Sequence, residues 1–361
     1  MKKILQLSTV HKSNDIRVYE KMSRSLLETN NIIYFIAIDS GVKLDDRVNF
    51  YPLYNKFKSN ILSRLFNNIK TIFLIIKIKP DIIHFHDPEL LIIGLFLQLF
   101  NKTVIYDVHE DVTKDIMHKK INNSIKKLII YFFKPFELFV ASQIDNVIVV
   151  TPSIYEKFQG KVNNLIMIRN FPNNKIVNNQ IYNNDKVSYV IYSGTISLNR
   201  GIFEIIEAIS LFNGKIRLRL VGEFQNEVLK DEIMNLEGWR YVDYMGFVSQ
   251  EKLYEYYSTS LIGLVTLHNI DTYCEAFPVK LFEYVNSGLP VVMSDFNLWK
   301  SFFKNKVVGE YVEPSDSNQI YNGINIILEN YDIYKSNVAS YYGIYVWENE
   351  KELLFEYYKN L

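Results

Sequence analysis

The chain has 361 residues, 48% of them hydrophobic and 22% charged, a balance typical of a globular protein large enough for two cores. Its net charge is zero, but residues 1–140 hold 21 Lys and Arg against 14 Asp and Glu, whereas residues 141–361 hold 19 against 26. The single cysteine, Cys274, excludes an internal disulfide and favours a reducing compartment.

No segment of the sequence is expected to cross a membrane or to direct export. The longest apolar run, Leu90–Leu97, is far shorter than the roughly 18–20 residues that a spanning helix needs. The apolar start of the chain is interrupted by Gln6 and Ser8 and has no small-residue cleavage site, so a first β-strand is expected there. We therefore predict a cytoplasmic protein.

Short apolar runs alternate with helical periods through the first half of the chain, as expected for strands buried on both faces of a parallel sheet. The predicted strands are Ile4–Ser8, Ile32–Ile38, Ile82–Phe85, Val104–Asp107 and Asn146–Val150. The predicted helices are Asp15–Glu28, Ile61–Ile78, Pro88–Phe100 and further helical sequence up to Ala141. This order predicts one doubly wound α/β domain over residues 1–172.

An Asn-rich stretch without periodicity, residues 173–187, predicts a linker. The alternation then restarts, which predicts a second α/β domain over residues 188–345. Its predicted strands are Tyr189–Ser193, Arg217–Val221, Tyr241–Tyr244, Leu261–Val265 and Pro290–Met293, and its predicted helices are Gly201–Leu211, Asn226–Leu236, Gln250–Tyr257 and Pro278–Ser287. The tail, residues 346–361, is a predicted helix, and its candidate buried positions are Trp347, Leu353, Leu354 and Tyr357.

The stretch from Tyr273 to Ser294 carries the strongest chemical signal. Glu275 and Glu283 lie eight positions apart on either side of a predicted helix start, and Lys280 stands between them. Pro278 suits the first turn of that helix, where its missing N–H is no loss. Lys280 and Glu283 share one face near the free amides of the helix start, which suits a phosphorylated, hydroxyl-bearing ligand such as a nucleotide sugar.

The glutamate spacing is not informative by itself. Glu20 and Glu28 have the same spacing, as do Glu348 and Glu356, and both pairs are typical of solvated helix faces. The Tyr273–Ser294 stretch differs because a helix start and a lysine separate its two glutamates. A helix cap and a surface charge are the alternative roles for that pair.

Six motifs along nearly the whole chain resemble those of the retaining, two-domain glycosyltransferases of family 4 (glycosyl transferases group 1). They are LSTVHKSNDIRVYEKM from Leu7, IIHFHDPELL from Ile82, VIYDVHED from Val104, YSGTISLNRGIFEIIEAI from Tyr192, YMGFVSQEKLYEYY from Tyr244 and EAFPVKLFEYVNSGLPVV from Glu275. Each motif is soft alone, and their order and spacing carry the resemblance.

This resemblance implies the GT-B fold, in which two Rossmann-like domains face each other across a cleft and the C-terminal helix returns to the N-terminal domain. The N-terminal domain would bind the acceptor and the C-terminal domain the donor. The implied activity is transfer of a sugar from a nucleotide-diphosphate sugar, UDP- or GDP-linked, to a glycan or lipid-linked glycan. Such reactions build bacterial surface polysaccharides, including lipopolysaccharide and capsule.

By position, the resemblance implies roles for the charged donor-site residues. Glu283 would bind the ribose hydroxyls and Glu275 the hydroxyls of the donor sugar, while Arg200 and Lys280 would hold the diphosphate. Cations and a helix N-terminus at this place would stabilise the charge that develops as the glycosidic bond breaks, each contributing a few kcal/mol. The alternative for Arg200 is an ordinary surface charge in a first helical turn.

The other donor-binding candidates lie on loops beside these charges. They are Gly194, Thr195, Gly246, Phe247, Val248, Ala276, Phe277 and Leu281. The Gly246–Val248 loop would lie under the nucleobase, and its alternative is a glycine turn with Phe247 in the core. Many relatives have a second arginine where this chain has Thr195, so the diphosphate clamp is expected to be lighter or to be completed by backbone amides.

The first domain supplies one further catalytic candidate, His109, which the resemblance places beside the donor sugar. The alternative is a loop histidine satisfied by its neighbours. The candidates for contact with the acceptor are His11, Asp15, Arg17, His86 and Glu110. Asp15 is equally suited to be a helix N-cap.

A metal site is not expected. His84 and His86 are two positions apart on one strand and therefore face the same way. A metal site needs three or four ligands, however, and no further ligand is spaced to join them. Asp87 precedes Pro88 and is predicted to be a helix N-cap. The resemblance likewise implies a metal-independent reaction without a cofactor, in which the departing phosphate accepts the proton of the acceptor and the anomeric configuration is retained.

Two other functions are compatible with this architecture. A nucleotide-sugar 2-epimerase would convert the donor without any acceptor. A catalytically degenerate copy would serve as a partner subunit, although the presence of Arg200, Lys280, Glu275 and Glu283 disfavours it.

Two basic, apolar segments are candidates for contact with an anionic membrane. Residues 56–79 hold six basic and no acidic side chains, and residues 114–134 hold Lys119, Lys120, Lys126, Lys127 and Lys134 among apolar residues. Helices of this kind can lie on an anionic bilayer, which predicts peripheral attachment to the inner face of the plasma membrane. A solvated helix face is the alternative. Nucleic acid is not an expected partner, because no recognisable binding module accompanies the basic residues.

Overall fold

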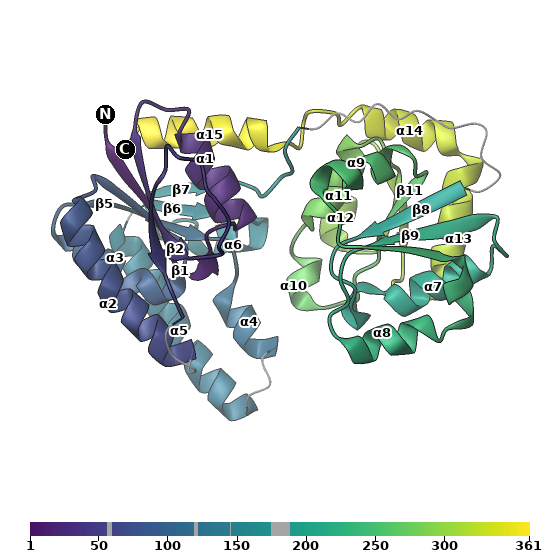
Figure 1. The fold of residues 1–361 in the computed structure, drawn as a ribbon, viewed down its shortest axis with the longest axis horizontal. Helices are drawn as coiled ribbons and strands as arrows, with labels where there is room; N and C mark the ends of the chain where they lie inside the picture. Colours follow the sequence, from purple (N-terminus) through teal and green to yellow (C-terminus); the bar gives the residue numbers. More distant parts are fainter. Residues whose placement is uncertain (56–59, 119–121, 145, 175–187) are drawn as a thin grey trace. The chain divides into compact units, whose positions relative to one another are not determined.

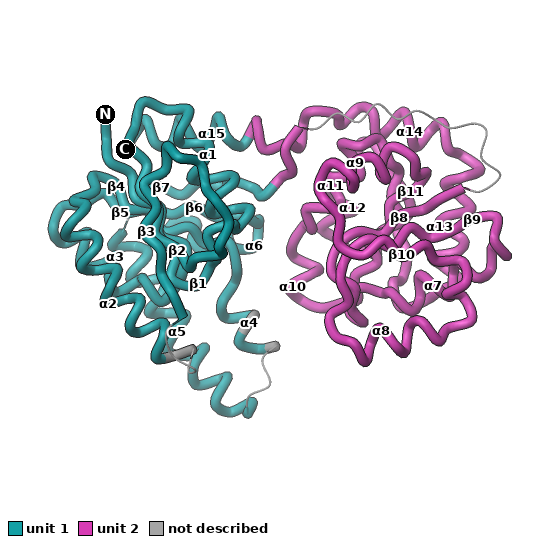
Figure 2. The backbone as a smooth tube through the Cα atoms, in the orientation of Figure 1, with its two compact units in different colours: residues 1–170, 350–361 teal, residues 171–349 magenta. Residues whose placement is uncertain are grey.

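The computed structural model describes residues 1–361 except 56–59, 119–121, 145 and 175–187. The chain forms two compact α/β units (Figures 1 and 2): unit 1 comprises residues 1–170 and 350–361, and unit 2 comprises residues 171–349. The predicted linker lies outside the described residues apart from its first two positions. The doubly wound fold that the sequence predicted is confirmed in both units.

Unit 1 is built on a seven-stranded parallel sheet in the order β3-β2-β1-β4-β5-β6-β7. Its strands are β1 (Lys3–Lys12), β2 (Ile32–Ile38), β3 (Asn49–Leu53), β4 (Ile82–Phe85), β5 (Thr103–Val108), β6 (Asn146–Val149) and β7 (Asn164–Met167). The central strands are buried on both faces, which explains their continuous apolar runs. The strand order reverses between β1 and β4, the place where such sheets bind ligands.

Helices cover the two faces of this sheet. They are η1 (Ile16–Ser23), α1 (Arg24–Leu26), α2 (Asn60–Ile78), η2 (Pro88–Leu90), α3 (Leu91–Leu99), α4 (Val112–His118), α5 (Asn123–Ile144) and α6 (Pro152–Phe158). The predicted helix at Asp15–Glu28 begins with the wide, π-type turns of η1. Asp15 is the N-cap of η1 and accepts hydrogen bonds from the amides of Arg17 and Val18. This was one of the two roles expected for Asp15.

Unit 2 has a six-stranded parallel sheet in the order β10-β9-β8-β11-β12-β13. Its strands are β8 (Ser188–Ser193), β9 (Ile216–Val221), β10 (Val242–Gly246), β11 (Ile262–Val265), β12 (Val291–Ser294) and β13 (Gly309–Val312). Its helices are η3 (Leu198–Arg200), α7 (Ile202–Ser210), α8 (Glu227–Met234), η4 (Glu237–Tyr241), α9 (Gln250–Ser258), α10 (Asp271–Cys274), α11 (Val279–Asn286), α12 (Asn297–Phe302), α13 (Ser317–Glu329) and α14 (Tyr331–Ala339).

The last helix, α15 (Trp347–Lys359), begins in unit 2 and continues into unit 1. Trp347 and Leu354 are buried as predicted, but Leu353 is 41% exposed and Tyr357 only partly buried. The predicted burial of Leu353 is wrong because Leu354 and Tyr358 define the buried stripe, and Leu353 falls one position outside it. Tyr358, four residues after Leu354, is the buried tyrosine that the sequence analysis missed.

Candidate active site

Lys280 is the central charged residue of unit 2. It is the second residue of α11, and the side chain is 8% exposed, with its Nζ 3.7 Å from the centre of the Tyr192 ring. Among the described residues, this Nζ has no hydrogen-bond partner. Burial, and next the nearby charge of Arg200, lower the pKa of the Lys280 ammonium well below its ordinary value, against the opposing charge of Glu283.

Arg200 and the loop after β8 lie beside this lysine. Gly194 adopts a positive φ of 114°, and a Cβ at this position would lie 3.3 Å from an Arg200 guanidinium nitrogen. The hydroxyl of Tyr192 donates a 2.6 Å hydrogen bond to the carbonyl of Thr195, which fixes the loop. The loop amides, Arg200 and Lys280 therefore gather at the carboxyl end of β8, the expected place for an anionic ligand.

Glu283 continues the same helix face and is held by a tyrosine. The Tyr257 hydroxyl donates a 3.0 Å hydrogen bond to Glu283 Oε2 and lies 2.9 Å from Ser193 Oγ. Ser193 Oγ is also 3.0 Å from the hydroxyl of the buried Tyr284. This network joins α9, α11 and the end of β8 and sets the direction of the Glu283 carboxylate.

The loop from Glu275 to Pro278 leads from α10 into α11. Glu275 follows the last residue of α10 and is partly exposed, and Pro278 is the N-cap of α11. The Ala276 carbonyl accepts a 2.9 Å hydrogen bond from Trp299 Nε1, which anchors the loop, and Phe277 packs on Phe282. The predicted donor contact of Leu281 does not extend to its side chain, because that side chain is fully buried in the core.

The predicted nucleobase loop follows β10. Gly246 has a positive φ of 63°, a conformation that favours glycine. Phe247 is 81% exposed, so the alternative that placed its ring in the core is wrong. Val248 packs against the core of unit 2 instead. The loop thus exposes the Phe247 ring between the turn at Gly246 and the packed side chain of Val248.

Unit 1 contains a pocket of about 220 Å³ at the carboxyl ends of its strands. It is lined mainly by polar residues: His11, Arg64, His86, Asp87, Glu89, Asp107, His109 and Glu110. His109, His11, His86 and Glu110 were predicted site residues, and the fold brings them together. Asp87, which directly precedes η2, and Glu89, which lies in η2, were not recognised as site residues in the sequence.

The His11 and Asp87 side chains form a pair in this pocket. His11 Nδ1 lies 3.1 Å from Asp87 Oδ1, and Asp87 Oδ2 accepts hydrogen bonds from Ser8 Oγ (2.9 Å) and the Thr9 amide (2.6 Å). Burial opposes the charge of His11, but the hydrogen bond and charge of Asp87 outweigh it and raise the His11 pKa. The predicted N-cap role of Asp87 is wrong: its carboxylate turns back to β1 and makes no cap hydrogen bond.

Asp107 lines the pocket and is completely buried. Arg17 donates two hydrogen bonds to its carboxylate, from Nε (3.0 Å) and from a terminal nitrogen (2.8 Å), and a third to the Ile168 carbonyl (3.2 Å). The guanidinium is itself buried, so the structure supports a different role for Arg17 from the predicted acceptor contact: it neutralises Asp107 and fixes η1 to β5. Despite burial, Arg17 and the two neighbouring histidines hold the pKa of Asp107 well below its usual range.

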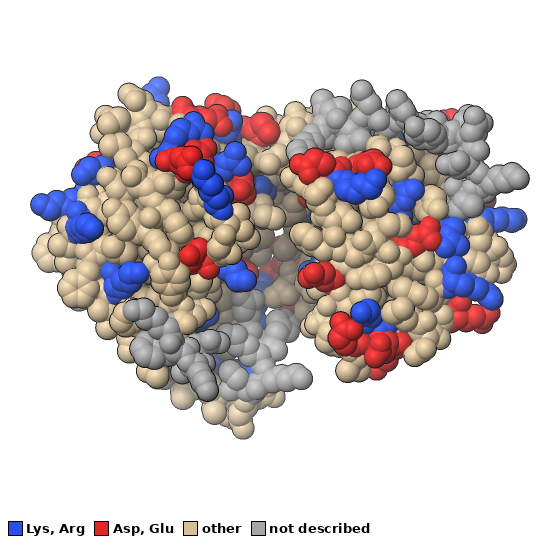
Figure 3. Space-filling model, viewed as in Figure 1, with Lys and Arg blue, Asp and Glu red and all other residues tan. Residues whose placement is uncertain are grey.

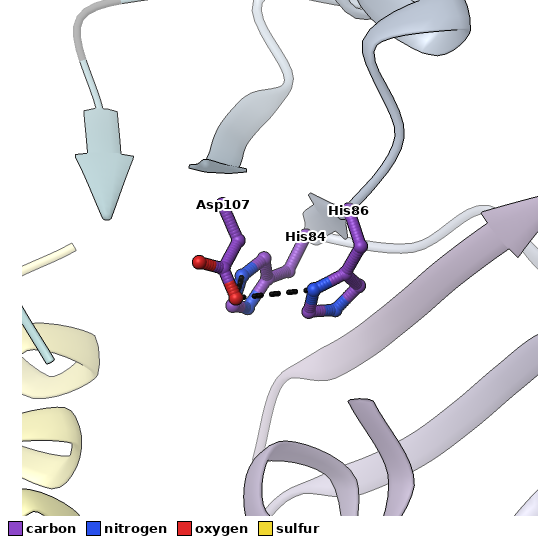
Figure 4. A group of neighbouring side chains, drawn as sticks. All are labelled: His84, His86 and Asp107. Carbon is purple, nitrogen blue, oxygen red and sulfur yellow. Dashed lines mark ion pairs between the residues drawn. The ribbon is translucent and has the colours of Figure 1, made fainter. Parts of the chain in front are cut away.

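His84 and His86 complete a buried polar layer with Asp107 (Figure 4). His86 Nδ1 lies 3.1 Å and His84 Nε2 3.7 Å from Asp107 Oδ2. On the other side, His86 Nε2 is 2.8 Å from Gln6 Oε1, and the Tyr358 hydroxyl of α15 is 2.7 Å from His84 Nδ1. Burial lowers the pKa of both histidines, to about 3 for His86.

These three side chains could in principle hold a metal, since their ligand atoms lie within 4.8 Å of one another. The sequence reasoning found no third ligand because Asp107 comes from the neighbouring strand β5. Two observations fit a metal poorly. Arg17 already binds both carboxylate oxygens, and all three side chains are closed off from solvent. The residues fit a buried ion-pair network better than a metal centre.

His109 is the remaining catalytic candidate of unit 1. Its ring meets that of His11 edge to face at 4.8 Å. Burial is the main cause that lowers its pKa to about 4, so the ring is neutral near pH 7. Its Nε2 has no hydrogen-bond partner among the described residues, which leaves a neutral imidazole nitrogen in the pocket.

Comparison with known families agrees with this geometry. The model of Glycosyltransferase Family 4 matches residues 17–170, and the model of glycosyl transferases group 1 matches residues 174–343. The chain belongs to these glycosyltransferases. The two matches meet where unit 1 gives way to unit 2, and together they span nearly the whole enzyme. A sequence search of curated proteins finds no match.

Solved structures with the same GT-B fold cover the entire glycosyltransferase. Sucrose-phosphate synthase from Thermosynechococcus elongatus is 18% identical with a TM-score of 0.73, and the match covers 100% of this chain and 99% of that one. Anabaena Alr3699/HepE, in complex with UDP and glucose, is 14% identical with a TM-score of 0.73 over 100% of both chains. WaaG, a glycosyltransferase involved in lipopolysaccharide biosynthesis, is 12% identical with a TM-score of 0.71, covering 98% and 99%.

Proposed function

We propose that this glycosyltransferase transfers a sugar, with retention of configuration, from a UDP- or GDP-linked donor to a glycan or lipid-linked glycan of a bacterial surface polysaccharide. The observation that carries the donor assignment is the buried Lys280 ammonium without a hydrogen-bond partner in the described chain, beside Arg200 and the start of α11. An unpaired buried cation is costly, and a bound diphosphate would neutralise it. The Anabaena neighbour solved with UDP-glucose supports a uridine nucleotide.

In this proposal the residues of unit 2 act by binding and charge stabilisation. Lys280, Arg200 and the Gly194–Thr195 amides hold the diphosphate, Glu283 binds the ribose hydroxyls, and Glu275 the sugar hydroxyls. As the glycosidic bond breaks, its electron pair moves to the phosphate oxygen, whose charge the cations stabilise. That oxygen accepts the acceptor proton while the acceptor oxygen bonds to the anomeric carbon. The reaction is proposed to need no metal.

A thermal-shift screen tests the donor assignment. A nucleotide that binds the folded state at about 100 times its Kd adds about 2.7 kcal/mol of stability, so UDP or GDP should raise Tm while CMP should not. Glu283→Gln should weaken nucleotide binding by roughly 10-fold or more, because a charge-assisted hydrogen bond contributes about 1.5–3 kcal/mol. Unchanged nucleotide affinity and turnover in Glu283→Gln would refute its ribose role.

We also propose that unit 1 docks on an anionic membrane through α2, α3 and α5, which Figure 1 shows on one side of the unit. Their exposed apolar side chains, here called the membrane face, are Leu62, Leu65, Ile69, Ile72, Phe73, Ile76, Ile92, Phe96, Leu99, Phe100, Ile125, Leu128, Ile129, Tyr131, Phe132, Phe136 and Phe139. So large an exposed apolar surface marks an interaction site. The sequence predicted the basic segments of α2 and α5 but not the contribution of α3.

The charges on these helices favour a lipid surface over a second apolar protein surface. Over their described ranges, α2, α3 and α5 carry several Lys and Arg side chains, and their single acidic residue, Glu137, is fully buried. Figure 3 shows the visible surface on the α2 side of unit 1 as mostly uncharged with scattered Lys and Arg. Each lysine near an anionic bilayer contributes about 1 kcal/mol. No helix in the described part of the chain is long and apolar enough to span a bilayer.

Vesicle flotation tests this surface. Phe73, Phe96 and Phe132 are 69%, 58% and 63% exposed, one on each helix, and changing each to Asp should weaken binding to phosphatidylglycerol-containing vesicles. We expect about 10-fold or more per site, because burying a phenylalanine contributes about 1.5–3 kcal/mol. Val228→Asp, at an exposed valine on α8 of unit 2, is the matched control and should bind as the parent does. Equal binding by all four variants would refute the membrane face.

A further inference from the structure

Tyr192 lies beside the donor-site cations; it is the first residue of the motif YSGTISLNRGIFEIIEAI, but the sequence analysis gave it no role. Tyr192 lies within β8, its side chain is uncharged, and it is fully buried. The ring lies under Lys280 Nζ at 3.7 Å, within the range of a strong cation–π contact. The Tyr192 hydroxyl donates a hydrogen bond to the carbonyl of Thr195, the residue that stands where many relatives have a second arginine.

We propose that Tyr192 is a positioning residue of the donor site, whose ring seats the Lys280 side chain, and that Lys280 takes up a proton when a nucleotide diphosphate binds. This inference rests on the proposed donor function. The ring lies 3.7 Å from the ammonium nitrogen, which has no hydrogen-bond partner among the described residues. A diphosphate would supply the missing negative charge.

Before a ligand binds, the surroundings of Lys280 favour partial loss of the proton from its side chain. From η3, Arg200 repels the ammonium, and burial disfavours its charged form, while Glu283 on α11 attracts it. Glu283 is itself engaged by Tyr257 of α9. The other titratable neighbours, Tyr192 and Tyr284, stay neutral near pH 7 because burial raises the pKa of each, to about 12 for Tyr192. An anionic ligand would therefore shift this balance toward the charged lysine.

Proton uptake is measured by titration calorimetry of UDP binding in buffers of different ionisation enthalpy. At about pH 8.5 a terminal phosphate with a pKa near 6 is already fully ionised, so the nucleotide itself takes up and releases almost no proton. The parent enzyme should take up a fraction of a proton per UDP, and the observed enthalpy should vary with the buffer. Lys280→Met should bind UDP more weakly and show no such variation. Buffer-independent enthalpy in the parent enzyme would overturn the proton-uptake part of the proposal.

Two substitutions test the seat formed by the tyrosine ring. Tyr192→Phe keeps the ring and loses only the hydrogen bonds of the hydroxyl, whereas Tyr192→Leu loses these and also the cation–π contact of about 0.5–2 kcal/mol, so its Kd for UDP should be about 2- to 30-fold higher than that of Tyr192→Phe. Proton uptake should persist in Tyr192→Phe. Equal UDP affinity in the two variants would overturn the positioning role. If Tyr192→Leu fails to fold, Tyr192→Met takes its place with the same expected loss of affinity, because it also removes the ring.

The two hypotheses fail in different ways. If the enzyme binds none of UDP, GDP, ADP or CMP, the proposed donor function fails. If it binds one of them without proton uptake and without dependence on the Tyr192 ring, the donor function stands and this inference fails.

Discussion

The two units use buried charge in opposite ways. In unit 1 the buried Asp107 carboxylate is already neutralised by Arg17, which donates two hydrogen bonds to it and a third to the Ile168 carbonyl. In unit 2 the buried Lys280 ammonium lies over an aromatic ring and is attracted by Glu283, but it has no hydrogen-bond partner within the described residues. The paired charges of Arg17 and Asp107 serve the folded chain itself, whereas the Lys280 charge, which lacks a hydrogen-bond partner, is available to bind an anionic ligand. The contrast separates structural ionic groups from binding groups that look alike in the sequence.

Removing Arg17 should produce the largest change in stability. Arg17→Met leaves the Asp107 carboxylate fully buried without its cation, which typically costs about 3–5 kcal/mol. Arg24→Met is the matched control, because Arg24 pairs with Glu20 on the exposed face of the same segment and such pairs contribute at most about 1 kcal/mol. Urea denaturation of both variants measures the difference. Equal losses would show that Asp107 does not depend on Arg17.

Removing Lys280 should act in the opposite direction on stability and strongly on turnover. Lys280→Met removes an unpaired buried charge, so we expect unchanged or slightly increased resistance to urea. Donor turnover should fall about 10²- to 10³-fold, the usual effect of deleting one group that stabilises transition-state charge. Lys300→Met, at an exposed lysine paired with Asp295, should change neither property. A large loss of stability in Lys280→Met would place Lys280 with Arg17 as a structural ion.

Tyr358→Phe tests whether the polar layer of unit 1 is complete, as the comparison requires. The hydroxyl lies 2.7 Å from His84 Nδ1 and accepts a 2.9 Å hydrogen bond from Gln6 Nε2, all of them buried. Its removal leaves buried polar atoms unsatisfied and should cost about 1–3 kcal/mol. Tyr357→Phe, next in sequence, removes only a 3.3 Å bond at an exposed site and should cost much less. Similar costs for both would indicate that water replaces the hydroxyl.

The sequence predicted most of the fold because its strands are continuous apolar runs buried on both faces. The prediction missed β3 and β7, the two edge strands of unit 1, whose residues are mostly partly exposed; β3 lacks a continuous apolar run, whereas β7 has only the short run Leu165–Ile168. It also missed β13, at the edge of the other sheet, for a similar reason: only Gly309 and Val312 are buried. Edge strands carry little periodic signal because one side has no partner strand.

The candidate site was predictable only where neighbouring residues in the sequence share an element. Lys280 and Glu283 lie on one helix, so their relation followed from helical spacing. Asp107 and Asp87 were missed as partners because their contacts come from elements distant in the sequence: Arg17 from the helix η1 for the first, and His11 from the strand β1 for the second. Contacts between strands depend on sheet order, which residue spacing alone does not specify.

The smallest expected effect concerns His11, which is less completely buried and paired than Arg17 but, unlike Lys280, has a hydrogen-bond partner. Its pair with Asp87 is partnered like Arg17, but 22% of the His11 side chain is exposed, so solvent reduces its contribution to at most about 1 kcal/mol. The folded-state pKa of His11 is raised above 6.5, with burial opposing and Asp87, Asp15 and Glu110 favouring the charge. The pair's contribution is therefore fully present below pH 6.5 and is lost as pH rises through the raised value. His11→Gln should flatten this part of the pH dependence of unfolding in urea, and an unchanged profile would mean that His11 is neutral in the folded enzyme.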